Sequence, residues 1–61
     1  MGEAPEQYLT TTEAAAVRRR KPQTLRKERW RGEGPPFIRD GGRVLYPRKA
    51  LERWLAERMV A

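Results

Sequence analysis

The chain of 61 residues contains no cysteine, histidine, serine or asparagine. It therefore has no disulfide, no thiolate or imidazole ligand for zinc, and no imidazole base that titrates near neutral pH. The commonest nucleophiles, serine and cysteine, are also missing. Six of the eight acids are scattered over the chain beyond its first seven residues and mostly adjoin basic residues, which favours surface pairing over catalysis: Glu13, Glu28, Glu33, Asp40, Glu52 and Glu57. We expect no enzyme activity, no metal, no cofactor and no small-molecule ligand.

Long hydrophobic runs are absent as well. No stretch approaches the roughly 20 apolar residues of a membrane-spanning helix. The N-terminal sequence "MGEAPEQY" lacks the basic start and apolar middle of a signal peptide. We expect a soluble protein of the cell interior with no membrane partner.

Positive charge is present in excess and lies in one block. The net charge is +6, and residues 18–31, "RRRKPQTLRKERWR", carry eight basic side chains and one acid, Glu28. This block alone therefore has a charge of +7, and the other 47 residues sum to −1. A solvated helix face is one interpretation, but such faces usually mix both signs. We favour a polyanionic partner.

The N-terminal half of the chain predicts two short helices. Residues 1–7 have no apolar periodicity and are expected to form a flexible leader to a single domain over 8–61. Thr10 and Glu13 have the spacing of a capping box, which predicts a helix over about 10–20. Pro22 suits the first position of a second helix over about 22–31, and the glycines at 32 and 34 end it.

The C-terminal half predicts a hairpin and a third helix. "FIR" and "RVLY" flank "DGG", a strong hairpin signal. From Pro47 onward, Leu51, Trp54, Leu55 and Met59 form one apolar stripe at helical spacing, with Trp54 expected to bury the most area. The order helix, turn, helix, hairpin, helix is that of a winged helix-turn-helix, which is mostly α with a small β-hairpin.

The second helix is the candidate for reading DNA. In a helix-turn-helix, this helix enters the major groove and offers its first turns to the base edges. With Leu25 facing inward, much of the helix's polar and basic surface faces outward. Gln suits adenine, and Arg or Lys suits guanine. The predicted base-reading residues are Gln23, Thr24, Arg26 and Lys27. Trp30 is expected to pack under the hairpin, or alternatively to lie against the sugar–phosphate surface.

The remaining cations are predicted to contact phosphate or the minor groove, the alternative being solvated charges. The phosphate set is Arg18, Arg19, Arg20, Lys21, Arg29 and Arg31. The hairpin set, expected to approach a minor groove, is Arg39, Gly41, Gly42 and Arg43. A membrane-surface or protein-interaction module lacks support because the basic block has no broad apolar face. An RNA target is a further alternative, although the chain lacks the stacking aromatics of single-strand binders.

With these elements in place, the chain resembles the excisionase-type, MerR-like winged-helix DNA-binding domains. The resemblance covers Tyr8 to about Arg58. It rests on "LTTTEAA", "PQTL", "GPPFI", "GGRVLY" and "ALERWL", whose order and spacing together are specific. The family usually has a glycine, an apolar residue and a serine cap where this chain has Arg19, Arg20 and Lys21. It often has tryptophan where Glu28 stands.

The resemblance implies a phage or prophage excisionase, also called a recombination directionality factor. Such a protein would bind double-stranded DNA at repeated sites, bend it, and direct an integrase towards excision without cutting DNA itself. Cooperative self-association on DNA and a location in the cytoplasm of a bacterial host are implied as well. A small transcriptional regulator with the same fold is the alternative.

Overall fold

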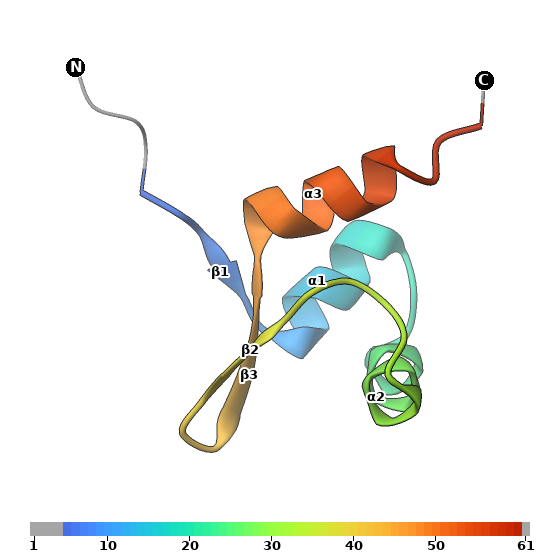
Figure 1. The fold of residues 1–61 in the computed structure, drawn as a ribbon. Helices are drawn as coiled ribbons and strands as arrows, with labels where there is room; N and C mark the ends of the chain where they lie inside the picture. Colours follow the sequence, from blue (N-terminus) through green and yellow to red (C-terminus); the bar gives the residue numbers. More distant parts are fainter. Residues whose placement is uncertain (1–4, 61) are drawn as a thin grey trace.

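The computed structural model describes residues 5–60 as three helices and a small sheet (Figure 1). The elements in chain order are β1 (Tyr8–Leu9), α1 (Thr11–Arg18), α2 (Pro22–Arg31), β2 (Ile38–Asp40), β3 (Arg43–Pro47) and α3 (Arg48–Ala56). The predicted fold class, a winged helix-turn-helix, is confirmed. No helix within residues 5–60 combines the length and apolar character that crossing a bilayer demands.

Helix α1 begins with the predicted capping box. The Glu13 N–H donates to Thr10 Oγ1 at 3.1 Å, and the Thr10 N–H donates to Glu13 Oε1 at 2.8 Å. The helix is shorter at its end than the expected 10–20, because Arg19 adopts the left-handed conformation with φ 56° and ψ 41°. The N–H groups of Arg19 and Arg20 then close the helix on the carbonyls of Ala16 and Ala15. Arg19 thus occupies the position where the resemblance expects glycine.

Helix α2 has the predicted bounds. Lys21 precedes it in an extended conformation and provides no side-chain cap, in agreement with the missing serine. Pro22 fills the first helical position, where its lack of an N–H costs nothing. Gly32 ends the helix in the left-handed region at φ 72°, which glycine adopts without a Cβ penalty.

Strands β2 and β3 form the predicted hairpin. Ile38 pairs with Leu45, and Asp40 pairs with Arg43, so Gly41 and Gly42 form a two-residue turn. Gly41 has φ 63°, the backbone conformation for which such turns select glycine. The hairpin projects from the body of the molecule as a narrow ribbon (Figure 1).

Strand β1 was not predicted and adds a third strand to the sheet. The order is β1-β3-β2, and Leu9 pairs with Tyr46 in an antiparallel ladder. The Arg48 N–H also donates to the Gln7 carbonyl at 2.7 Å, and the Lys49 N–H donates to Glu6 Oε2 at 3.3 Å. Of the expected leader over 1–7, residues 1–4 lie outside the described residues. Its flexibility stays a prediction.

The core draws on every element except the edge strand β2. The core cluster consists of the buried side chains of Leu9, Ala14, Ala15, Leu25, Tyr46 and Leu51, with Phe37, Val44 and Leu55 packed against them. Two residues of the predicted apolar stripe behave differently. Met59 is 79% exposed, because α3 already ends at Ala56. Trp54 is only half-buried, and Tyr46 is the largest side chain that is fully buried.

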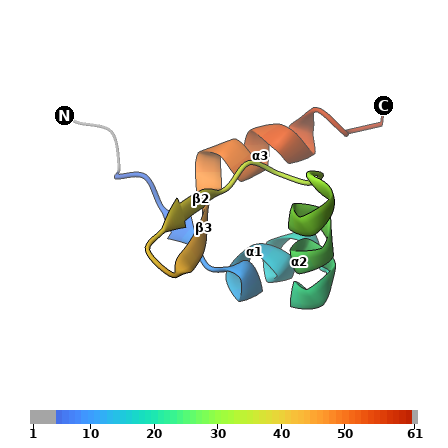
Figure 2. The same cartoon turned by 60° about the horizontal axis from the view of Figure 1, so that its bottom comes forward.

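The helices and the hairpin give the molecule two sides. Figure 1 places α2 and the hairpin turn on one side and α3 on the other. The view in Figure 2 shows α1 between α2 and the hairpin. The helix predicted to read bases and the ribbon predicted to enter a minor groove therefore project from the same side.

Candidate nucleic-acid interface

Helix α2 separates its residues cleanly into two faces. Leu25, Glu28 and Arg29 recur at helical spacing; Leu25 is fully buried and the other two are half-buried. The exposed side chains of the opposite face are Gln23, Arg26, Lys27, Trp30 and Arg31. Three of the four predicted base-reading residues thus face solvent together. The fourth, Thr24, is half-buried.

Glu28 and Arg18 lock α2 onto the end of α1. Arg18 donates from Nη1 to Glu28 Oε1 at 2.6 Å and from Nη2 to Oε2 at 2.9 Å. The two side chains are only 7% and 21% exposed. Hydrogen bonding from Arg18, reinforced by its positive charge, lowers the pKa of Glu28, and the same hydrogen bonds raise the pKa of Arg18.

Arg18 is therefore engaged inside the protein. Its guanidinium also lies 4.7 Å from the ring centroid of Trp54. The guanidinium of Arg58 lies 3.7 Å from the centroid of the same ring. No observation tests the predicted contact between Arg18 and phosphate. Because its side chain is buried and paired with Glu28, we do not include Arg18 in the candidate interface. Glu28, where the resemblance expects tryptophan, is explained by this ion pair.

Arg29 joins α2 to the rest of the core. Its Nη1 donates to the Tyr46 hydroxyl at 2.8 Å and to Thr11 Oγ1 at 3.2 Å. Its guanidinium lies 5.8 Å from the ring centroid of Phe37, beyond the end of α2. Arg29 was predicted to contact phosphate; the structure places it where it fixes the orientation of α2 against α1 and β3.

The other cations of the basic block are turned outward. Arg19, Arg20, Lys21 and Arg31 are exposed. Within residues 5–60, only Arg18 among the eight basic side chains of residues 18–31 forms an ion pair with a carboxylate. The turn and the outer face of α2 thus present positive charge that no acid of the described chain neutralises, which is the electrostatic character of a phosphate-binding surface.

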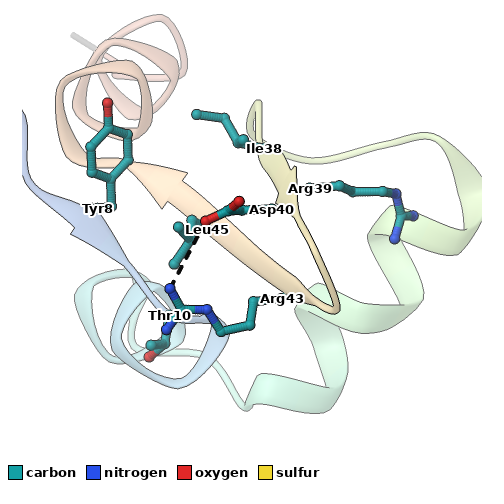
Figure 3. Close-up of a pocket in the computed structure, with 7 residues that line it drawn as sticks. All are labelled: Tyr8, Thr10, Ile38, Arg39, Asp40, Arg43 and Leu45. Carbon is teal, nitrogen blue, oxygen red and sulfur yellow. Dashed lines mark ion pairs between the residues drawn. The ribbon is translucent and has the colours of Figure 1, made fainter.

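The side chains of the two hairpin arginines, Arg39 and Arg43, project from opposite faces of the ribbon. Figure 3 shows Arg39 directed away from Asp40 and Arg43, as the alternation of a strand requires. Arg43 Nη2 lies 4.0 Å from Asp40 Oδ2, and both side chains are mostly exposed. Arg39 instead lies on the side of Phe37, 5.4 Å from its ring centroid. The structure does not bring the two hairpin arginines together.

The outer face of the sheet forms a shallow hollow (Figure 3). Tyr8, Ile38 and Leu45 supply its apolar lining, and Tyr8 and Ile38 are 50% and 41% exposed. The hollow exists because α1 and α3 pack with Leu9 and Tyr46, which point to the other face of the sheet.

Trp30 does not pack under the hairpin, so that expectation was wrong. Its side chain is 89% exposed. The reason is the rotation of α2: Leu25, Glu28 and Arg29 all bind inward, and Trp30 follows them on the opposite face. The spacing of Trp30 from Gln23 and Lys27, seven and three residues, carries this information in the sequence.

Comparison with known proteins gives one family. A family model described as a helix-turn-helix domain matches residues 8–59 of the 61 residues. The searches against curated proteins and against solved structures returned no significant match.

Proposed function

The chain belongs to the family of helix-turn-helix domains, and we propose that it binds double-stranded DNA with sequence specificity as a phage-type excisionase. Family membership supports DNA binding, because the second helix of this motif enters the major groove. In the proposed complex, Gln23, Arg26 and Lys27 read base edges from the exposed face of α2. Arg19, Arg20, Lys21 and Arg31 neutralise phosphates on either side of them.

One observation carries the proposal. The outward face of α2 exposes an amide and several cations that no carboxylate within residues 5–60 pairs with, while the inward face is held by Leu25, Glu28 and Arg29. Because the inward face holds the helix in place, the backbone of α2 need not reorient on binding, and only its exposed side chains lose conformational freedom. The hairpin turn lies on the same side, where Arg39 and the turn at Gly41 can approach a neighbouring minor groove (Figure 2).

DNA binding is tested by the anisotropy of a labelled duplex at several salt concentrations. If about five phosphates are neutralised, the log–log slope of affinity against salt should be near −4 to −5. The double variant Lys21→Gln/Arg31→Gln, which removes two proposed phosphate contacts at the two ends of α2, should flatten the slope by about 2 units. Lys49→Gln/Arg53→Gln removes the same charge from α3 and is the matched control. Equal effects of the two double variants, or a flat slope for the parent protein, would exclude the α2 interface.

Specificity is tested with single substitutions on α2. Gln23→Ala or Arg26→Ala should weaken binding to the specific site by about 1–3 kcal/mol and binding to random duplex by less. The site itself is found by footprinting the DNA that flanks the gene. Losses of equal size on both DNAs would reassign these side chains to phosphate contacts.

The resemblance of the motifs to excisionase-type domains supports the role in excision, with an integrase as partner and cooperative binding of several copies. A lone winged helix covers few base pairs, which favours repeated sites. An excision assay with the cognate integrase and a promoter-reporter assay run side by side decide the role. If the protein leaves the direction of recombination unchanged but alters the activity of a nearby promoter, it is a small transcriptional regulator.

A further inference from the structure

We infer that Trp30 forms an apolar contact with the sugar–phosphate backbone of bound duplex DNA. This inference rests on the proposed function and adds to it a residue that carries no charge and reads no base. It begins from the 89% exposure of a tryptophan on the same face of α2 as Gln23, Arg26 and Lys27.

The position of Trp30 along α2 indicates the backbone rather than the bases. Trp30 lies seven residues beyond Gln23, which is about 10 Å along the helix axis. In a helix-turn-helix the first turns of the recognition helix reach the base edges. A side chain two turns further along, in the last turn of α2, therefore meets the ridge that borders the groove. There, an indole can cover a deoxyribose, and its N–H can donate to a phosphate oxygen.

The surroundings of Trp30 favour DNA over a membrane or a second protein. Its neighbours on α2 are Arg26, Lys27 and Arg31, and they are exposed. A single ring does not form the broad apolar face that a membrane-surface helix needs. A cationic rim around an apolar centre matches the alternation of phosphates and sugars on a duplex. The same rim opposes association with another copy of a chain whose net charge is +6.

Fluorescence separates Trp30 from Trp54, which are the two tryptophans of the chain. Trp54→Phe leaves Trp30 as the only tryptophan, and Trp30→Phe leaves the half-buried Trp54 as a matched control. Acrylamide should quench Trp30 strongly in the free protein, and saturating duplex should reduce its quenching constant several-fold. Quenching of Trp54 in the control should change little. If Trp30 becomes less quenched by acrylamide as the protein concentration rises in the absence of DNA, Trp30 lies in a contact between copies of the chain and the inference is wrong.

Binding assays supply an independent readout. Trp30→Ala should weaken binding about tenfold, the value of burying roughly 60 Å² of apolar surface, and equally on specific and random duplex. The salt slope should stay unchanged, since tryptophan neutralises no phosphate, whereas Arg31→Ala, at a proposed phosphate contact, should flatten it by about 1.

The failures of the two proposals are distinguishable. If the Trp54→Phe protein binds duplex with the expected salt slope and Trp30 remains fully open to acrylamide, the contact proposed here is wrong and DNA binding stands. If neither the parent nor the Trp54→Phe protein binds duplex, the proposed function itself is wrong.

Discussion

Substitution of Glu28 by glutamine tests what orients the candidate recognition helix. The change keeps the size and shape of the side chain and removes its charge. Arg18, with a side chain only 7% exposed, would then lose two charge-assisted hydrogen bonds of 2.6 and 2.9 Å. Glutamine can accept one of them at most in the same geometry, because its second terminal group is a donor.

The expected magnitude follows from the burial of the pair. Exposed ion pairs contribute about 0.2–1 kcal/mol, and removing one partner of a fully buried pair costs about 3–5 kcal/mol. A pair at 7% and 21% exposure lies between these cases, so Glu28→Gln should cost about 2 kcal/mol. A domain of this size has a total unfolding free energy of roughly 3–9 kcal/mol. The loss is therefore a large fraction of its stability.

Urea and thermal unfolding measure the effect. For a domain of about 60 residues, 2 kcal/mol corresponds to a fall in Tm of roughly 8–16 °C. Glu52→Gln is the matched control. The Arg48–Glu52 pair has a single contact of 3.1 Å, and its side chains are 42% and 57% exposed, so it is neither bidentate nor buried. The control should cost less than about 0.5 kcal/mol. Equal losses in the two variants would refute the structural role of the Arg18–Glu28 pair.

The pH dependence provides a second check on the same pair. Because Arg18 lowers the pKa of Glu28 in the folded protein, the unfolded chain binds this proton more readily. The stabilisation is complete above the unfolded pKa of about 4.3 and is lost as the pH falls through the lower, folded pKa. The stability difference between the parent and Glu28→Gln should therefore shrink below about pH 4. A difference that stays constant down to pH 2 would contradict the cause assigned to the pKa.

Three further substitutions test the backbone and the core. Gly34→Ala should lower the free energy of unfolding in urea by about 2–3 kcal/mol, because φ at this position is 91° and the new Cβ would lie 2.8 Å from Glu28 Oε1. Gly42→Ala is the control and should be near neutral, because its new Cβ would meet nothing within 4 Å. Arg19→Gly should raise the unfolding free energy by roughly 0.5–1 kcal/mol by relieving a left-handed arginine. Tyr46→Phe should cost about 1.5–2 kcal/mol by removing the acceptor of Arg29, and an unchanged Tm would show that this hydrogen bond is dispensable.

The elements were predictable wherever short-range chemistry decides them. The capping box at Thr10, the proline at the start of α2 and the glycine turn at Gly41 each act within four residues, and each appears in the structure as expected. The end of α1 was misplaced because Arg19 takes a conformation usual for glycine, which no propensity favours. Strand β1 was missed because two residues are too few to show the alternation of apolar and polar side chains that marks a strand. Its partners in β3 also lie more than 35 residues further along the chain.

The candidate site was predictable as a region and less so residue by residue. The excess of cations in residues 18–31 is visible in the sequence, but their division between solvent and core is not. Arg18 meets Glu28, ten residues away, and Arg29 meets Tyr46, seventeen residues away, only after the helices and sheet have packed. Trp30 was expected to pack under the hairpin in preference to lying against the sugar–phosphate surface, but the inward contacts of its helix neighbours leave it exposed.

This division changes the charge that DNA would encounter. Arg18 and Arg29 are committed to contacts within the protein, which leaves six outward cations in the block: Arg19, Arg20, Lys21, Arg26, Lys27 and Arg31. At about 0.9 per neutralised phosphate, six cations give a limiting salt slope of about −5, whereas all eight would give about −7. A measured slope near −7 would require two further cations at the DNA, either Arg39 and Arg43 of the hairpin or Arg18 and Arg29 released from Glu28 and Tyr46. The variant Arg39→Gln/Arg43→Gln separates these cases: a slope that returns to about −5 assigns the extra charge to the hairpin, and an unchanged slope means that Arg18 and Arg29 leave their partners.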